Sequence, residues 1–169
     1  MVKALVNTHE FFRGIKGVEI RSAVPRWVAL RIRPDLALRE KVVQFFRSSL
    51  SDLPDETCEQ LAVALHELLG NAIEHGGRSH PRSAIDFTYI RTSRMVLFQI
   101  RDAGTGFSIE KINHAALNNP PDDPLRHVEH RTQMGLRPGG FGIMVVQQIA
   151  DDLIYSEQGN EVALIKYLD

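Results

Sequence analysis

Cysteine is almost absent from the sequence, and long apolar runs are absent altogether. The single cysteine, Cys58, excludes an internal disulfide and any metal site built on two cysteines. No run reaches the roughly 18 apolar residues that a membrane-spanning helix needs, and residues 1–10 lack the apolar core of a secretion signal. We therefore expect a cytoplasmic protein that is neither secreted nor embedded in a membrane.

An excess of either charge is also absent. The 20 Lys and Arg residues nearly balance the 21 Asp and Glu residues, and the formal net charge is −1. A nucleic-acid-binding protein usually carries a basic excess or a basic stripe, so we expect no direct contact with nucleic acid. What the sequence has in quantity is apolar residues, 43% of 169, enough for one ordinary domain with a sizeable core.

Interpretable patterns begin at Val18, so we interpret residues 1–17 as an N-terminal extension and residues 18–169 as the domain. Apolar residues at helical spacing predict helices, and β-branched or alternating residues predict strands. In chain order we expect strands at 18–20 and 27–32, helices at 36–50 (with Asp35 as N-cap) and 55–75, a hairpin of 84–92 and 94–102, helices at 109–116 and 143–150, and a hairpin of 153–156 and 162–167. Because helices lie between strand pairs, this order predicts an α+β fold, a two-layer sandwich with a largely antiparallel sheet.

The helix expected at 55–75 has an apolar face and a polar face. Glu67 and Asn71 lie four residues apart on the polar face, so a carboxylate and an amide carbonyl project in the same direction. That pairing suits a general base beside a hard cation. Gly70 lies between them, where glycine costs on the order of 1 kcal/mol relative to alanine, which indicates that another group approaches closely. The alternative is a polar face that is simply solvated.

A second segment, Asp102-Ala103-Gly104-Thr105-Gly106, directly follows an expected strand. An aspartate at a strand end can accept a hydrogen bond from an exocyclic amine. Gly104 and Gly106 would let the backbone approach a flat ligand. The segment also fits an ordinary surface turn. It is not a dinucleotide-binding fingerprint, because Ile109 stands where the third glycine is required.

A third segment, Gly139-Gly140-Phe141-Gly142, leads into an apolar helix that begins at Ile143. Free N–H groups and the dipole at a helix N-terminus favour bound phosphate. The alternative is a flexible hinge ahead of a packed helix. A Walker P-loop is excluded, because the sequence contains no Gly-x-x-x-x-Gly-Lys followed by Ser or Thr.

Together and in this order, the three segments resemble the GHKL ATPase superfamily of histidine-kinase-like ATPase domains. Residues 67–72 with His75 resemble its N box, residues 102–106 its G1 box and residues 139–143 its G2 box, and the match spans about 18–168. The resemblance implies the Bergerat-type fold, in which helices cover one face of a mixed, mostly antiparallel sheet. The small size, and the lack of a helix pair bearing a phosphoacceptor histidine, resemble single-domain anti-sigma-factor serine/threonine kinases of the RsbW and SpoIIAB type.

The resemblance also implies cofactors and residue roles. ATP would bind with Mg²⁺, Glu67 would be the general base, and Asn71 would coordinate the metal. Asp102, Gly104 and Gly106 would hold the adenine. The phosphates would lie on the backbone of Gly139, Gly140, Phe141, Gly142 and Ile143. The loop at about 117–138 corresponds to the ATP lid, in which Arg126, Arg131 and Arg137 are candidates for contact with phosphate.

The function implied by the resemblance is a serine/threonine protein kinase of a bacterial partner-switching system. It would phosphorylate a small anti-sigma-factor antagonist of the STAS type, and a sigma factor is a second candidate partner. One alternative is a non-catalytic module that senses adenine nucleotides and switches a protein partner. Another is a detached catalytic domain that serves a histidine kinase. The sequence leaves the partner's identity open, and it equally leaves open whether the chain forms a homodimer.

Overall fold

A single six-stranded sheet runs through the computed structural model, which describes residues 6–76, 83–106, 133 and 141–168. The strands are β1 (Val18–Val24), β2 (Trp27–Ile32), β3 (Ile85–Arg91), β4 (Met95–Arg101), β5 (Asp152–Tyr155) and β6 (Glu161–Tyr167). Across the sheet their order is β1-β2-β3-β4-β6-β5, and each of these neighbours pairs antiparallel. The predicted α+β fold with a largely antiparallel sheet is confirmed.

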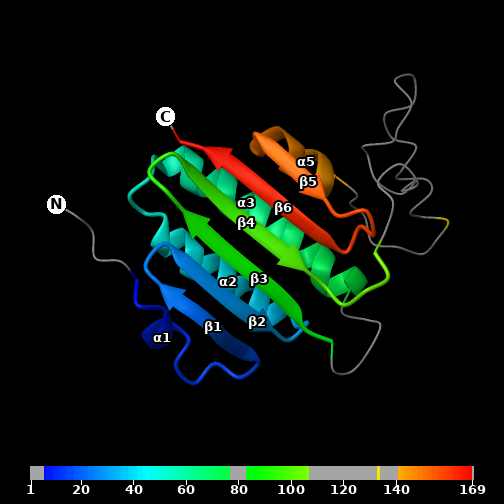
Figure 1. Ribbon diagram of the computed structural model, residues 1–169, viewed down its shortest axis with the longest axis horizontal. Coiled ribbons are helices and arrows are strands. Elements are labelled where there is room, and N and C mark those ends of the chain that lie inside the picture. The colour runs from blue at the N-terminus through cyan, green and yellow to red at the C-terminus, as the bar shows by residue number, and fades with distance from the viewer. Residues whose placement is uncertain (1–5, 77–82, 107–132, 134–140, 169) are drawn as a thin grey trace.

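The helices form the second layer, on one face of the sheet (Figure 1). They are α1 (Thr8–Phe11), α2 (Leu36–Ser49), α3 (Asp55–Asn71), the π-helical turn η1 (Ala72–Gly76) and α5 (Gly142–Ile149). Of these, α3 packs between α2 and α5. The helix expected at 109–116 and the loop expected at 117–138 lie outside the described residues. Within the described part of the chain, no helix is both long enough and apolar enough to cross a membrane.

The hydrophobic core lies between the sheet and the helices. Alternate residues of the central strands are buried toward the helices, such as Phe87 and Tyr89 of β3 and Phe98 of β4. Phe46 of α2 packs against these three rings at centroid distances of 4.9, 4.8 and 5.7 Å. The buried side of α3 consists of the residues expected there, among them Leu61, Leu65, Leu68, Leu69 and Ala72 of the following turn. Each such side chain contributes about 1.5–3 kcal/mol when buried, so this face fixes the rotation of α3.

The start of α2 follows the expectation from sequence. The Asp35 carboxylate accepts a hydrogen bond from the backbone N–H of Ala37 at 2.9 Å, as an N-cap does. This hydrogen bond, with a second from Arg33, holds the pKa of Asp35 below its usual value. The cap fixes where α2 begins and hence how it lies against α3.

The first hairpin is longer than predicted. We expected a strand at 18–20, but β1 continues to Val24, with a bulge between Ile20 and Ser22. Pro25 and Arg26 form the tight turn, and Arg26 takes a left-handed backbone with φ of 66°. The prediction ended too early because Pro25 was interpreted as a break between separate strands, whereas proline also fits the corner of a turn.

The described part of the predicted N-terminal extension contacts the domain core. Phe11 and Phe12 lie at the end of α1, and their rings approach the ring of Phe45 at centroid distances of 5.2 and 5.0 Å. Phe12 is only 5% exposed and belongs to the core cluster. This segment therefore adds apolar packing to the outer side of α2.

Candidate functional site

The polar side of α3 meets the first residue of α5. At Gly142, a Cβ atom would collide with Oε2 of Glu67 and lie 3.3 Å from its Cδ. Glycine at this position is therefore what lets the Glu67 carboxylate lie against the start of α5. The Glu67 side chain remains 37% exposed, so it is also accessible from outside. The first and third sequence segments converge at this contact.

Asp102 ends β4 and meets the other end of the same helix. Its Oδ1 accepts a hydrogen bond from the Gly104 N–H at 2.7 Å. A Cβ atom at Gly76 would collide with the Asp102 carboxyl, and one at Gly104 would lie 2.9 Å from Cα of Gly76. The second segment is thus packed on the end of η1, where two glycines allow contact between the backbones.

Burial sets the electrostatics of Asp102. It raises the pKa of the carboxyl above its usual value, although the Gly104 hydrogen bond and nearby His75 oppose the shift. A carboxylate held partly away from water gains more from a hydrogen-bond donor than an exposed one does, because an unsatisfied charged group is costly to bury. This end of the site therefore suits a ligand that presents an N–H group.

The last hairpin braces the segment after β4. Gly106 has φ of 75°, and a Cβ atom there would collide with the backbone carbonyl of Gln158. Asn160 binds the strand end twice: its carbonyl accepts the Asp102 N–H at 2.9 Å, and its Nδ2 donates to the Asp102 carbonyl at 3.3 Å. Its Oδ1 accepts from the Ser156 hydroxyl at 3.4 Å. Sequence reasoning placed Asn160 in the turn of the last hairpin and did not assign it a role at the site.

Asn71 is the last residue of α3, one turn after Glu67, and is partly buried. We expected a regular helix to continue to about residue 75. Instead, the turn from Ala72 to Gly76 widens to π geometry. Such turns are frequent at functional sites, and this one ends with Gly76 against Asp102. The helix from residue 67 to 76 spans about 13 Å, a length that a nucleoside triphosphate can bridge.

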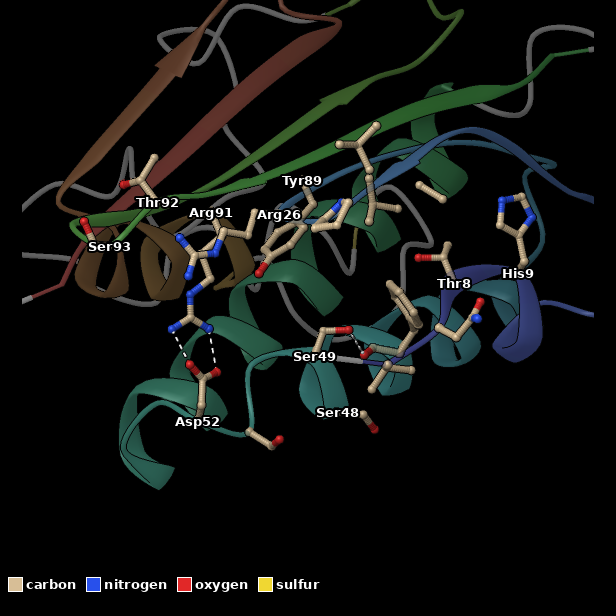
Figure 2. A pocket seen from close by; sticks show the side chains of 18 residues that line it. Thr8, His9, Arg26, Ser48, Ser49, Asp52, Tyr89, Arg91, Thr92 and Ser93 are labelled. Carbon is tan, nitrogen blue, oxygen red and sulfur yellow. Dashed lines mark hydrogen bonds and ion pairs between the residues drawn. The ribbon is translucent and has the colours of Figure 1, made fainter. Parts of the chain in front are cut away.

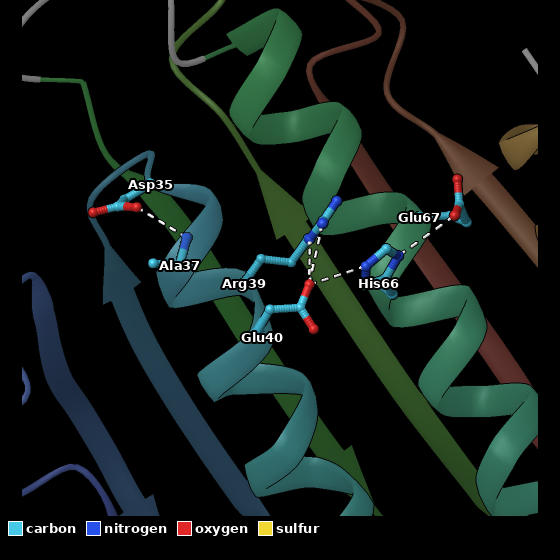
Figure 3. Close-up of polar contacts among 6 residues, drawn as sticks. All are labelled: Asp35, Ala37, Arg39, Glu40, His66 and Glu67. Carbon is cyan, nitrogen blue, oxygen red and sulfur yellow. Dashed lines mark hydrogen bonds and ion pairs between the residues drawn. The ribbon is translucent and has the colours of Figure 1, made fainter. Parts of the chain in front are cut away.

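The close approach expected at Gly70 comes from the chain itself. A Cβ atom at Gly70 would lie 2.9 Å from Nη1 of Arg39 on α2. Arg39 pairs with Glu40 at 3.1 Å, and Glu40 Oε1 contacts His66 Nε2 at 3.1 Å. The other ring nitrogen of His66, Nδ1, lies 3.4 Å from Glu67 Oε1. Figure 3 shows the resulting row of polar contacts that leads from α2 to Glu67.

Some predicted site residues cannot be placed. Gly139 and Gly140 lie outside the described residues, as do the lid arginines Arg126, Arg131 and Arg137. Phe141 is 39% exposed just before α5, whereas Ile143 is 8% exposed and packs inward. The proposed phosphate-binding roles of this segment remain predictions.

The donor set bears on which metal the site can hold. In the described part of the chain, no three His, Cys, Asp or Glu side chains gather into a metal-binding group. An all-protein cage of the zinc or calcium kind is therefore not formed by these residues. Mg²⁺ commonly takes one or two protein oxygens and completes its shell with phosphate and water oxygens, and a single amide such as that of Asn71 fits this pattern.

A cleft of about 800 Å³ lies elsewhere, at the opposite end of β3 and β4 from Asp102 (Figure 2). It lies between the β1–β2 turn, α1, the end of α2 and the β3–β4 turn. Within it, Arg91 holds Asp52 through two hydrogen bonds of 2.6 and 2.7 Å. Its lining includes none of the predicted site residues, so we place the candidate site at the Glu67–Asp102 face instead.

The chain is similar to several known proteins. The model of the family described as histidine kinase-like ATPase domain matches residues 32–166. The serine-protein kinase RsbW of Oceanobacillus iheyensis is 27% identical over 114 residues, which cover 67% of each chain. The proteins of the same name from Listeria monocytogenes and Listeria innocua are 25% and 24% identical over 146 residues, which cover 82% of this chain and 88% of theirs.

Proposed function

Because the chain belongs to the family of histidine kinase-like ATPase domains, we propose that it binds ATP with Mg²⁺ and transfers the γ-phosphoryl group to a serine or threonine hydroxyl of a partner protein. One observation carries the proposal. Two glycine-containing segments, far apart in the chain, contact the helical stretch 67–76 near its two ends: Gly142 contacts Glu67, and Gly104 contacts Gly76 beside Asp102.

The adenine lies at the Asp102 end. The Asp102 carboxylate accepts a hydrogen bond from the exocyclic amine of adenine. Guanine carries a carbonyl at that position, which would face the carboxylate with a second acceptor. Gly104 and Gly106 let this segment pack closely against Gly76 and Gln158, and Asn160 holds the Asp102 backbone in place. Burial of Asp102 supports this role, because the carboxylate lacks the full hydration that would compete with a ligand.

The phosphates lie between Asn71 and the start of α5. The N-terminus of α5 carries N–H groups without helical partners, which favour anions. Asn71 would hold Mg²⁺ through its side-chain carbonyl oxygen. When bound, the metal would offset charge on the phosphates and help to position them. Such positioning and charge stabilisation are the main demands of phosphoryl transfer.

Glu67 acts on the attacking hydroxyl. Its carboxylate accepts the proton as the hydroxyl oxygen forms a bond to the γ-phosphorus. The bond from that phosphorus to the β–γ bridging oxygen breaks, and ADP leaves with the electron pair. The accessible position of Glu67 beside Gly142 supports this role, because a protein substrate must reach it.

The identity of the partner protein is the most specific part of the proposal. The relatives are named serine-protein kinases, and the resemblance to anti-sigma-factor kinases favours a small STAS-type antagonist as the phosphorylated protein. We propose a sigma factor as the second partner of this chain. We also propose that the chain acts in the cytoplasm and forms a homodimer.

Nucleotide binding and transfer can be tested separately. Thermal unfolding is recorded with Mg²⁺-ATP and Mg²⁺-GTP for the wild-type chain and for Asp102→Asn. A ligand at a hundred times its Kd stabilises the native state by about 2.7 kcal/mol. Because ATP is expected to bind more tightly than GTP, it should raise the melting temperature more at equal concentration. Transfer from [γ-³²P]ATP to a STAS-type antagonist from the same genome is then measured for wild type and Glu67→Gln.

Glu59→Gln is the matched control, since Glu59 also lies on α3 but pairs with Arg47 of α2. We expect transfer by wild type and Glu59→Gln and little by Glu67→Gln. Binding of ATP without transfer or hydrolysis would favour the nucleotide-sensing module instead. No response to either nucleotide would contradict the whole proposal.

A further inference from the structure

His66 lies between two carboxylates, one on its own helix and one on the neighbouring helix. Its Nδ1 is 3.4 Å from Oε1 of Glu67, and its Nε2 is 3.1 Å from Oε1 of Glu40 on α2. The ring is about one-third exposed. Figure 3 shows the imidazole bridging the space between α2 and the Glu67 side chain.

The chemistry of the ring follows from these partners. An ionised carboxylate only accepts hydrogen bonds, so a ring nitrogen that contacts one must carry the proton. A neutral imidazole can donate to one of the two carboxylates, and an imidazolium can donate to both. Among the described residues, the charged groups that contact His66 are Glu67 from α3 and Glu40 from α2, and Arg39 of α2 pairs with Glu40.

The two oxygens of Glu67 have different neighbours. Oε1 faces His66 Nδ1, whereas Oε2 is the atom that a Cβ at Gly142 would strike. We propose that His66 is a positioning residue, which holds Oε1 through its Nδ1–H so that Oε2 stays directed at the start of α5. This inference rests on the proposed function, in which Glu67 accepts the proton of the attacking hydroxyl.

A tether of this kind has a physical purpose. A glutamate side chain that is 37% exposed can sample several rotamers, and a displacement of about 1 Å at a reacting group can reduce the rate about a hundredfold. The tether is itself supported, because Glu40 holds the far side of the ring and Arg39 holds Glu40. Gly70 gives Arg39 its space, which accounts for a glycine near the end of α3.

The chain offers a matched pair of variants to test this. The amide nitrogen of asparagine occupies nearly the place of Nδ1 in histidine, and that of glutamine nearly the place of Nε2. His66→Asn therefore keeps a donor toward Glu67 and loses the one toward Glu40, and His66→Gln does the reverse. Both replace the ring with an uncharged amide in the middle of the same helix, so a loss of packing alone would affect them alike.

Two readouts are recorded on the full chain. The first is the ¹³C carboxyl resonance of Glu67, identified with Glu67→Gln and compared with that of Glu59. This NMR measurement does not depend on any catalytic activity of the chain. The second is single-turnover hydrolysis of Mg²⁺-ATP, with the rate at saturation separated from the apparent affinity for ATP.

We expect His66→Gln to shift the Glu67 resonance and His66→Asn to leave it near the wild-type position, with Glu59 unchanged in both. The saturating rate should fall about tenfold or more in His66→Gln alone, at unchanged affinity for ATP. A Glu67 resonance that is unchanged in His66→Gln, or shifted equally in both variants, would overturn the inference while wild-type hydrolysis still supports the proposed function. A resonance shifted only in His66→Gln, in a chain that neither hydrolyses ATP nor transfers its γ-phosphoryl group to a partner protein, would support the tether and contradict the kinase.

Discussion

The Glu67 carboxylate lies against Gly142, so that a single methyl group at position 142 would collide with Oε2. This contact joins α3 to α5 through two residues that lie 75 positions apart in the sequence. It explains why α5 begins with a glycine.

Gly142→Ala should separate activity from stability. Alanine is the better helix former by up to about 1 kcal/mol, and the atom that it would strike is the mobile end of a side chain. We expect a melting temperature at or above that of wild type and a large loss of phosphoryl transfer, because Glu67 must move. Gln147→Ala, at an exposed position of the same helix, is the control and should leave transfer unchanged. Equal transfer by both variants would contradict the role of the contact.

Asp102→Asn should weaken ATP binding without unfolding the protein. Burial raises the pKa of Asp102, so the folded state holds its proton more tightly than the unfolded state. Stability therefore falls as the pH rises from the ordinary carboxyl value of 3.8 through the raised folded value. Asparagine does not ionise, so the variant avoids this fall in stability, and its amide oxygen can still accept the hydrogen bond from the Gly104 N–H. Urea unfolding of the two proteins at several pH values should show the variant at least as stable as wild type near neutral pH; a clearly less stable variant would count against this electrostatic account.

Asp52→Asn should affect acid stability and leave nucleotide binding intact. Burial alone would raise the pKa of Asp52, but two hydrogen bonds and the charge of Arg91 outweigh it and lower the pKa. The contribution of Asp52 to the free energy of unfolding is therefore fully present at pH values above its ordinary pKa. It is lost as the pH falls through the lowered pKa of the folded state. Because Asp52 is half exposed, we expect its ion pair with Arg91 to contribute roughly 1 kcal/mol or less to the free energy of unfolding. The slope of stability against pH below 4 should flatten in the variant, and an altered affinity for ATP would be unexpected.

Asn160→Ala should loosen the adenine end. The variant loses the donor to the Asp102 carbonyl and the acceptor for Ser156, and such a hydrogen bond is worth about 0.5–1.5 kcal/mol. We expect ATP affinity to fall by up to about tenfold. Ser156→Ala keeps the Asn160 contact with Asp102 and should have a smaller effect. Calorimetric titration with Mg²⁺-ATP measures both, and an unchanged affinity in Asn160→Ala would remove this residue from the site.

Local patterns were sufficient to predict most of the fold. The apolar spacing of α3 predicted which side is buried, and Asp35 predicted where α2 begins. Both signals lie within a few residues of the feature that they determine. The end of β1 was misjudged because proline marks a tight turn and a strand break alike, and the π turn was missed because five residues do not distinguish its period from that of an α-helix.

The internal supports of the candidate site could not be predicted in the same way. The Asn160 contacts with Asp102, the position of Arg39 over Gly70 and the bridge from His66 to Glu40 each depend on how separate elements pack. No spacing within one segment encodes them. The sequence indicated that Gly70 permits a close approach, but only packing shows that a side chain of α2 makes it.

The proposed function requires that one nucleotide reaches both Gly104 and Gly142. The direct measurement is a titration of the ¹⁵N-labelled chain with Mg²⁺-ATP in which the backbone N–H resonances of both glycines are followed. Both should shift along one binding curve at one equivalent of ATP, while Thr92, in the cleft at the far end of the sheet, stays in place. A response at only one glycine, or at neither while Thr92 shifts, would contradict the claim.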